Sequence, residues 1–109
     1  REAFQSLPYG FAAAIVMIGL GRAGSVAVSA AGAWLATPPP VRVVSKTGAG
    51  DSFVAGAVLG LAEGMALSRC LALATAAATA AVTTPATELC SRAGTDAILP
   101  QVTIRALEA

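Results

Sequence analysis

The stretch Thr47-Gly48-Ala49-Gly50-Asp51-Ser52-Phe53 joins an apolar segment to a long helix of small residues, and most of the predicted fold and function depends on it. Its small residues let the backbone turn tightly with the amides exposed. The first amides of a helix have no intrahelical partner and lie at the positive end of its dipole. We therefore expect an anion site made of main chain here.

The carboxylate of Asp51 is unexpected at such a site, because its negative charge repels an anion. It is understood if Asp51 is a reacting group beside a bound phosphate. The alternative is an acid that only complements the helix dipole, worth about 0.3–1 kcal/mol. The stretch is not a P-loop, since the nearest lysine, Lys46, precedes the glycines instead of following them.

These residues resemble the Gly-Ala-Gly-Asp signature of the PfkB (ribokinase-like) carbohydrate kinases. The resemblance extends through Pro38-Pro39-Pro40-Val41, Val44-Ser45, Ala55-Gly56, Leu61-Ala62-Glu63 and Leu89-Cys90-Ser91, and is greatest to the branch with the minor bacterial 6-phosphofructokinases and the 1-phosphofructokinases. It implies an α/β chain that forms the C-terminal part of a ribokinase-like three-layer α/β/α sandwich. Residues 1–109 would be the C-terminal nucleotide-binding and catalytic part of one kinase domain.

The resemblance also implies the chemistry, which is ATP-dependent phosphorylation of a hydroxyl on a sugar or sugar phosphate. Asp51 would be the general base, and Gly48, Ala49 and Gly50 would form the anion hole for the γ-phosphate. Mg²⁺ would accompany the nucleotide, held largely by groups outside this segment. The acceptor-binding residues are also expected elsewhere, so we expect the segment alone to be inactive and the intact protein to be a homodimer.

A second glycine motif, Gly19-Leu20-Gly21-Arg22-Ala23-Gly24, follows an apolar run. Its spacing matches the Gly-x-Gly-x-x-Gly dinucleotide fingerprint, which also requires a helix after the third glycine and an acid about 20 residues later. Instead a strand pattern follows, and no acidic residue lies between Glu2 and Asp51. In the PfkB family a Ser/Thr-Leu-Gly-x-x-Gly turn lies here against the nucleotide phosphates, which implies ATP contacts from Gly19, Leu20, Gly21 and Gly24. Gly19 stands where the family usually has a hydroxyl residue.

Two other functions stay open beside the kinase. One is an NAD-binding dehydrogenase fragment, supported only by the glycine fingerprint. The other is a nucleotide-binding module without catalytic activity.

Hydrophobic periodicity predicts the elements between these motifs. We expect a helix end at 1–7 with a turn at 8–10, and a strand buried on both faces at 12–18. A hairpin follows with strands at 25–29 and 33–37, and a short strand at 41–45. The signature helix, 50–63, should carry one broad apolar face of Phe53, Val54, Ala57, Val58 and Leu61, and Gly64 should end it. Its small residues Ala55, Gly56 and Gly60 should let another helix or the edge of a nucleotide pack close. A second helix should run from Leu67 or Ser68 to Thr83, with Ser68 as a candidate cap. After a loop at 84–91, Thr95-Asp96 should cap a short helix that Pro100 ends, and 102–106 should be a strand.

Thr75, Thr79 and Thr83 recur every four positions in the second helix and so share one stripe. Either they bond their own backbone carbonyls, or, as the resemblance implies for Thr75 and Thr79, they border the adenine pocket. The resemblance further implies monovalent-cation ligands, K⁺ being the candidate ion. They would be Ser45, Thr47, Ala81, Thr84, Ala86 and Glu88.

Composition limits the partners. The 109 residues are 56% hydrophobic and 12% charged, with a net charge of +1, so we expect neither nucleic-acid binding nor attraction to an anionic membrane. The apolar runs are shorter than the roughly 20 residues that cross a bilayer. Two cysteines without metal-ligand spacing, and no histidine, suggest a reduced cytoplasmic protein without a Ser-His-Asp or Cys-His site in this segment. Lys46, Arg22 and Arg42 are expected to be solvated, with Arg22 the better functional candidate of the two arginines.

Overall fold

The computed structural model describes residues 15–84 and 91–107. Its elements are, in chain order, β1 (Val16–Gly19), the 3-10 helix η2 (Gly21–Ala23), β2 (Ser25–Ser29), β3 (Gly32–Thr37), α2 (Ala49–Ala62), α3 (Leu67–Val82), α4 (Arg92–Ile98), the 3-10 helix η3 (Leu99–Gln101) and β4 (Thr103–Leu107). The hairpin, both long helices and the final strand are therefore confirmed, each within a residue or two of its predicted bounds. The predicted helix end at 1–7 and turn at 8–10 lie outside the described residues.

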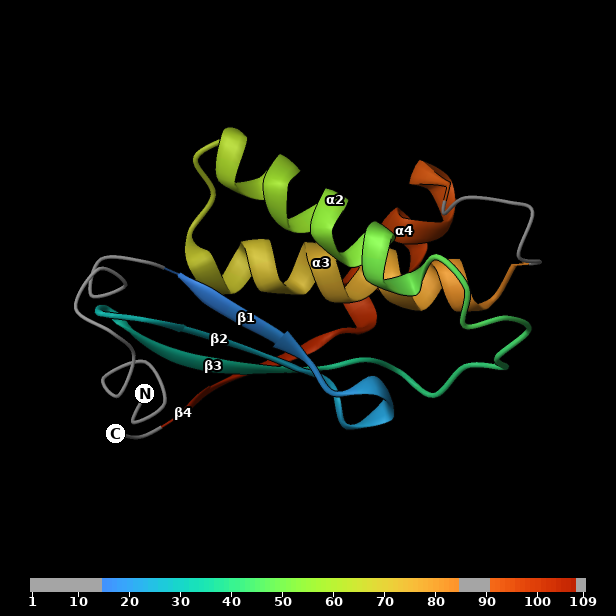
Figure 1. Ribbon diagram of the computed structural model, residues 1–109, viewed down its shortest axis with the longest axis horizontal. Helices are drawn as coiled ribbons and strands as arrows, with labels where there is room; N and C mark the ends of the chain where they lie inside the picture. Colours follow the sequence, from blue (N-terminus) through green and yellow to red (C-terminus); the bar gives the residue numbers. More distant parts are fainter. Residues whose placement is uncertain (1–14, 85–90, 108–109) are drawn as a thin grey trace.

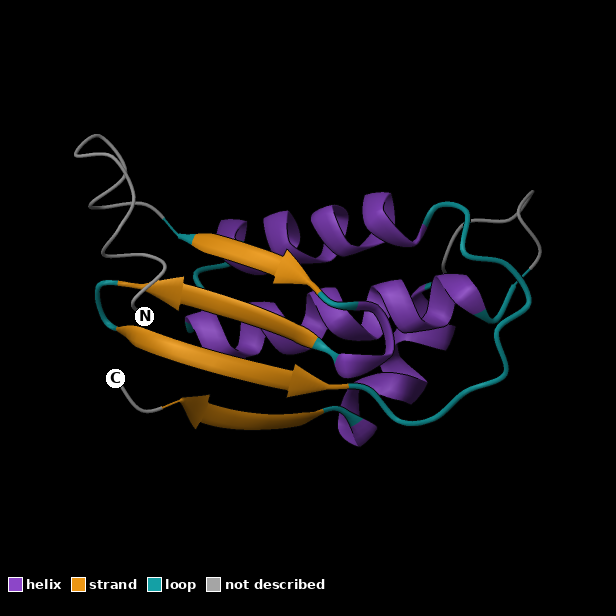
Figure 2. Cartoon of the chain, turned by 60° about the horizontal axis from the view of Figure 1, so that its bottom comes forward, coloured by secondary structure: helices purple, strands orange, loops and turns teal. Residues whose placement is uncertain are grey.

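The four strands form one antiparallel sheet in the order β1-β2-β3-β4. Figure 2 shows the helices together on one face of this sheet, and in Figure 1 α3 lies between the sheet and α2. The α/β class is thus confirmed. The described residues supply the sheet and one helical side of the predicted sandwich.

Alternation along the strands builds a core on each face of the sheet. On the helix side, Ala27 of β2 and Ala36 of β3 are fully buried against Leu71 of α3. On the other side, Val28 and Ala33 are paired across the hairpin and nearly fully buried. Each strand of the hairpin thus contributes small or branched residues to both faces.

Helix α3 is buried along most of its length because its residues are small. Ten of its residues are buried, among them Cys70, Leu71 and a series of alanines. Alanine has the highest helix propensity, and its short side chain lets the sheet and α2 both approach the helix axis. Ser68 does not cap this helix as predicted, since the cap position is Ala66 and Ser68 lies inside the first turn.

Helix α2 approaches α3 most closely at two of its glycines. A Cβ added at Gly56 would lie 2.9 Å from the Cα of Ala74, and one at Gly60 would lie 3.0 Å from the Sγ of Cys70. Gly64 ends the helix at φ +74° as predicted. The predicted apolar face of α2 is buried only in part: Ala57 is buried, whereas Val54 and Val58 are more than half exposed and Leu61 is 44% exposed. The close approach of another helix at Gly56 and Gly60, one of the two outcomes expected for these small residues, is therefore confirmed.

The Cys70 thiol lies in this helix contact and donates a hydrogen bond to the carbonyl oxygen of Met65 at 3.5 Å. Burial raises the pKa of the Cys70 thiol. It therefore stays protonated near neutral pH and behaves as a small apolar side chain.

Two predicted strands differ from the structure. Of the strand predicted at 12–18, residues 12–14 lie outside the described residues and residues 16–18 belong to β1. This strand lies at the edge of the described sheet, with Ile15 and Ile18 more than 40% exposed, because β2 is its only described neighbour. The segment at 41–45 belongs to no strand and bends at Val44. It is held instead by α3, since the amides of Val44 and Ser45 donate to the carbonyl oxygen of Val82 at 2.7 and 3.2 Å.

Candidate nucleotide pocket

The signature stretch opens α2 in the predicted way. Gly48 is the residue before the helix and has φ +83° and ψ −4°, a left-handed conformation that favours glycine. The Ser52 amide donates to the Gly48 carbonyl at 2.9 Å, which closes the first helical turn. The Ala49 amide donates weakly to the Lys46 carbonyl at 3.4 Å. Gly50 and Asp51 therefore hold the first-turn amides best placed to receive an anion.

The second glycine motif forms a compact turn between β1 and β2. The Leu20 amide donates to the Gly24 carbonyl at 2.7 Å, and the Gly24 amide donates back to the Gly21 carbonyl at 3.1 Å. The chain passes from this turn through the three-residue η2 into β2, so the long helix that a dinucleotide fingerprint needs does not follow. The geometry disfavours the NAD alternative.

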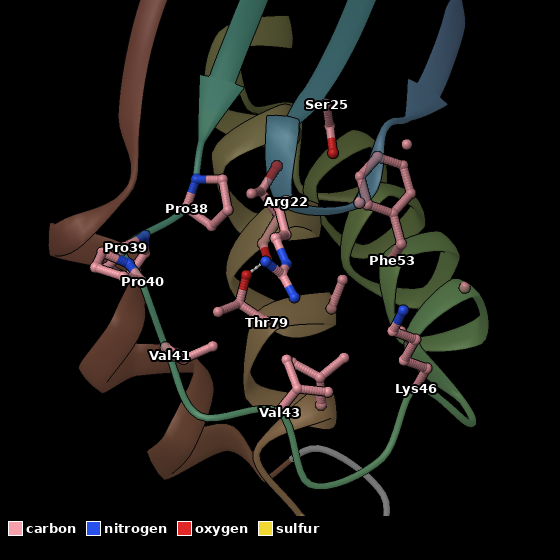
Figure 3. Close-up of a pocket in the computed structure, with 17 residues that line it drawn as sticks. Arg22, Ser25, Pro38, Pro39, Pro40, Val41, Val43, Lys46, Phe53 and Thr79 are labelled. Atoms are coloured by element: carbon pink, nitrogen blue, oxygen red, sulfur yellow. Dashed lines mark hydrogen bonds between the residues drawn. The ribbon is translucent and has the colours of Figure 1, made fainter.

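Both glycine motifs border one pocket of about 1000 Å³ (Figure 3). Six of the predicted site residues line it: Gly19 and Gly21 from the turn, Ala49 and Gly50 from the start of α2, and Thr75 and Thr79 from α3. Four others do not line it: Leu20, Gly24, Gly48 and Asp51. Asp51 is exposed and directly follows Gly50, which places it beside the pocket at the start of α2.

Thr75 and Thr79 bond their own backbone carbonyls, as the first interpretation predicts, and they also face the pocket. The Thr75 hydroxyl donates to the Leu71 carbonyl at 2.7 Å, and the Thr79 hydroxyl donates to the Thr75 carbonyl at the same distance. Both residues also line the pocket. Because each hydroxyl hydrogen is used inside the helix, these side chains offer the pocket a methyl group and an acceptor oxygen and no free donor.

The pocket wall also contains residues that the sequence analysis did not assign to a site. They are Ser25, Pro38, Pro39, Pro40, Val41, Val43, Phe53, Ala78 and Val82. Val41 and Val43 belong to the segment predicted as a strand at 41–45. The structure shows no strand there, and both residues line the pocket.

Two cationic residues, Arg22 and Lys46, complete the lining. Both are exposed, as the sequence predicts, yet both border the pocket. Arg42 is also exposed but does not line it. None of the acidic residues in the described ranges lines the pocket, so its side chains carry only positive charge.

The structure brings together part of the predicted monovalent-cation set. The amide bond from Ser45 to the Val82 carbonyl places the loop before the signature beside the C-terminal end of α3, which contains Ala81. The Ser45 hydroxyl accepts from the Thr47 amide at 3.1 Å, and the Ala81 carbonyl accepts from the Thr84 hydroxyl at 3.0 Å. Ala86 and Glu88 lie outside the described residues.

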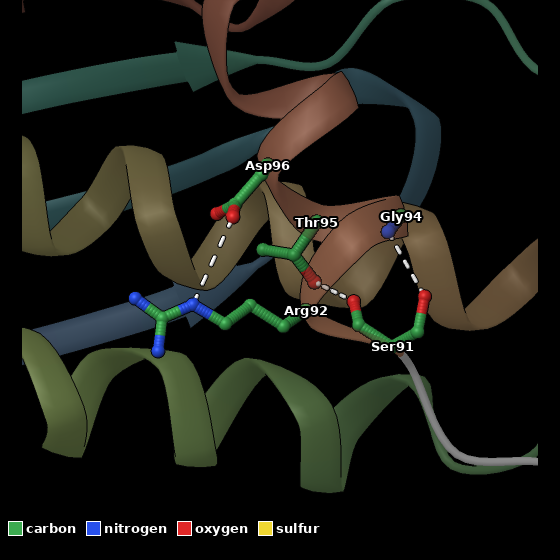
Figure 4. Close-up of polar contacts among 5 residues, drawn as sticks. All are labelled: Ser91, Arg92, Gly94, Thr95 and Asp96. Atoms are coloured by element: carbon green, nitrogen blue, oxygen red, sulfur yellow. Dashed lines mark hydrogen bonds and ion pairs between the residues drawn. The ribbon is translucent and has the colours of Figure 1, made fainter.

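A smaller groove of about 320 Å³ runs between α2, α3 and α4. The start of α4 in this groove corrects a predicted cap: the Ser91 hydroxyl accepts from the Gly94 amide at 2.9 Å, while Thr95 and Asp96 lie inside the helix (Figure 4). The Thr95 hydroxyl donates to the Ser91 carbonyl at 2.9 Å. Arg92 and Asp96 form an exposed ion pair at 3.8 Å, which contributes little to stability.

Residues 15–84 and 91–107 contain no group of three or more His, Cys, Asp or Glu residues that could hold a metal ion. None of their helices has both the length and the apolar character needed to span a membrane.

Comparisons with known proteins agree with this geometry. The profile of the pfkB family carbohydrate kinases matches residues 2–93. A 1-phosphofructokinase of Escherichia coli is 54% identical over 46 residues, which are 42% of this chain and 15% of that protein.

Solved structures extend the likeness to the fold. The structure of phosphofructokinase-2 from Escherichia coli in complex with potassium superposes with a TM-score of 0.84 and 34% identity, over 92% of this chain and 32% of that one. A ribokinase from Thermotoga maritima superposes with a TM-score of 0.71 and 27% identity, over 79% of this chain and 30% of that one. The chain thus spans about a third of these enzymes or less. Because the family profile covers most of its residues, the chain belongs to the pfkB family of carbohydrate kinases and has their ribokinase-like α/β fold.

Proposed function

We propose that the intact protein transfers the γ-phosphoryl group of ATP to a hydroxyl of a sugar or sugar phosphate. The observation that carries the proposal is the start of α2, where Gly50 lines the pocket and exposed Asp51 follows it directly. An anion site and a carboxylate base are therefore neighbours at one helix end. That pairing suits phosphoryl transfer, in which the protein positions the reactants and neutralises charge.

In the proposed reaction, the pocket binds the nucleotide and Asp51 acts on the acceptor. The acceptor oxygen attacks the γ-phosphorus, the bond to the β-phosphate oxygen breaks, and ADP leaves. The Asp51 carboxylate accepts the hydroxyl proton as the oxygen attacks. The amides of Ala49, Gly50 and Asp51, with the helix dipole behind them and Gly48 shaping the turn, stabilise the negative charge on the transferred group.

The nucleotide would lie between the turn at Gly19–Gly24 and α3. The backbone of Gly19, Leu20, Gly21 and Gly24 would approach the phosphates. Thr75 and Thr79 would border the base, supported by the apolar wall that includes Val43. Mg²⁺ would come with ATP, with its protein ligands outside this segment.

A monovalent cation, K⁺, is proposed near the signature loop. The E. coli phosphofructokinase-2 in the comparison was solved with potassium. In this chain the Ser45 amide bonds the Val82 carbonyl, so the loop that holds Ser45 and Thr47 lies beside the end of α3, and this proximity supports a shared site with Ala81 and Thr84. Ala86 and Glu88 would complete the set.

The acceptor is proposed to be a phosphofructokinase-type substrate, on the strength of the 1-phosphofructokinase and phosphofructokinase-2 relatives. A homodimer stays a prediction, which the mass of the intact protein in solution would test.

Asp51→Asn in the intact protein tests the function. ADP release would be measured with fructose 1-phosphate, fructose 6-phosphate, tagatose 6-phosphate, ribose and fructose. We expect one acceptor to stimulate release, and the substitution to lower kcat about 10²- to 10⁴-fold while ATP still binds. Glu63→Gln, at the far end of the same helix, is the matched control and should keep full activity. ATP binding without acceptor-stimulated release would instead indicate a non-catalytic module.

A further inference from the structure

Two cationic side chains enter the pocket from different loops, and neither has been given a role. Arg22 belongs to the turn between β1 and β2, and Lys46 to the loop before Gly48. In Figure 3 the Arg22 side chain extends into the pocket from the turn, and the Lys46 side chain enters from the opposite rim.

The backbone holds both residues in place. Arg22 lies in η2, which is closed by the hydrogen bond from the Gly24 amide to the Gly21 carbonyl. The carbonyl of Lys46 accepts from the Ala49 amide at 3.4 Å, so its loop is joined to the start of α2. These hydrogen bonds tie the backbone at Arg22 and Lys46 to the turn and to the start of α2.

Neither cation is neutralised by the protein where the structure describes it. Within residues 15–84 and 91–107 the only ion pair is Arg92–Asp96, far along the chain in α4. The pocket lining contains Arg22 and Lys46 but no acid. Two like charges facing one cavity, beside first-turn helix amides, favour an occupant that carries several negative charges.

We propose that Arg22 and Lys46 form a two-sided clamp on the polyphosphate chain of the bound nucleotide. This rests on the proposed function and adds to it, since the glycine backbone and helix amides account for phosphate binding without any side-chain cation. Lys46, next to Ala49 and Gly50, places a point charge at the end of the chain where transfer takes place. Arg22 offers a planar fork that binds phosphate oxygens in pairs from the other side.

The test is nucleotide affinity as a function of phosphate number. Calorimetry on the intact protein would give Kd for ATP, ADP and AMP in Lys46→Met, Arg22→Met and the double variant. Each single substitution should weaken ATP binding about tenfold and AMP binding much less. The dependence of ATP affinity on salt should also become shallower.

Two controls separate the clamp from general effects. Arg42→Met removes a cation from the same loop that does not line the pocket, and should leave all three affinities unchanged. Lys46→Arg keeps the charge and should retain most of the ATP affinity.

Wild-type ATP affinity in Lys46→Met and Arg22→Met would overturn the clamp. So would an equal loss for ATP and AMP, which would place the cations at the base or ribose. In either case acceptor-stimulated ADP release by the unaltered protein would persist, so the proposed function would stand. Failure of the unaltered protein to bind ATP would overturn both.

Discussion

Two glycine-rich turns border the same pocket, but they keep their shapes for different reasons. In the turn at Gly19–Gly24, Gly24 has φ +106°, and the position where a Cβ would stand is occupied by the backbone of Ala36 on β3. At the start of α2, Gly48 has φ +83° and no atom within 4 Å of where a Cβ would stand. The first turn is fixed by a neighbouring strand, and the second by the helix that it begins. A glycine motif in a sequence therefore does not reveal whether packing or backbone freedom requires it.

Gly24→Ala should have the largest effect on stability. The added Cβ would overlap the carbonyl oxygen of Ala36, which belongs to a buried strand and cannot move away cheaply. The backbone angles of Gly24, φ +106° and ψ −150°, are also nearly restricted to glycine. We expect a loss of about 3 kcal/mol or more in the free energy of unfolding, measured by denaturant titration of the intact protein.

A loss below about 1 kcal/mol for Gly24→Ala would contradict the close contact with β3. Gly21→Ala is the matched control, because Gly21 has φ +61° in the same turn but open space around it. It should cost about 1–2 kcal/mol, from the left-handed conformation alone.

Gly48→Ala should have an intermediate effect on stability and a separate effect on catalysis. Its left-handed conformation costs a residue with a Cβ about 1–2 kcal/mol, without steric overlap. Any relaxation of that strain would tilt the amides of Gly50 and Asp51, so kcat should fall about tenfold.

Gly64→Ala provides the comparison for Gly48→Ala. Gly64 ends α2 at φ +74°, also in open space, and lies far from the pocket lining. It should lose similar stability and keep its kcat. Equal kcat losses in the two variants would mean that the Gly48 effect comes from general destabilisation of α2.

Local patterns predicted most of the fold, and tertiary packing explains where they failed. The hairpin and α3 follow from alternation and from alanine propensity, which act within a few residues. The packing of α2 was predicted in part: Gly56 and Gly60 admit another helix closely, as expected, whereas Val54 and Val58 of the predicted apolar face are exposed. Hydrophobic periodicity predicts which face of a helix is apolar, but it does not predict which residues on that helix allow the closest approach of a neighbour.

The residues of the candidate site that belong to a recognisable sequence motif could be predicted. Those brought to the pocket by the folding of a loop could not. Gly50 and Gly21 line the pocket as the two glycine motifs suggested. Val41 and Val43 alternate as residues of a strand do. Their position on the pocket wall becomes clear only in the structure, where the next residues bond the Val82 carbonyl at the end of α3. A lysine before a helix is ordinarily expected to be solvated, so the sequence did not predict that Lys46 lines the pocket. Its position there depends on how the loop before α2 folds.

Gly19→Ser should have the smallest effect, and it is the one substitution expected to increase both stability and ATP affinity. Gly19 ends β1, pairs with Ser25, and has nothing within 4 Å of an added Cβ, so a side chain fits without strain. Loss of glycine flexibility in the unfolded chain should stabilise the protein by about 0.4–1 kcal/mol. The new hydroxyl would stand at the pocket rim, where the family usually has one, and should tighten ATP binding about fivefold through one added hydrogen bond.

Gly19→Ala is the control, since it gives the same stabilisation without the hydroxyl. Equal ATP affinity in the serine and alanine variants would mean that this turn approaches the nucleotide through its backbone alone, as the glycines at the start of α2 are proposed to do.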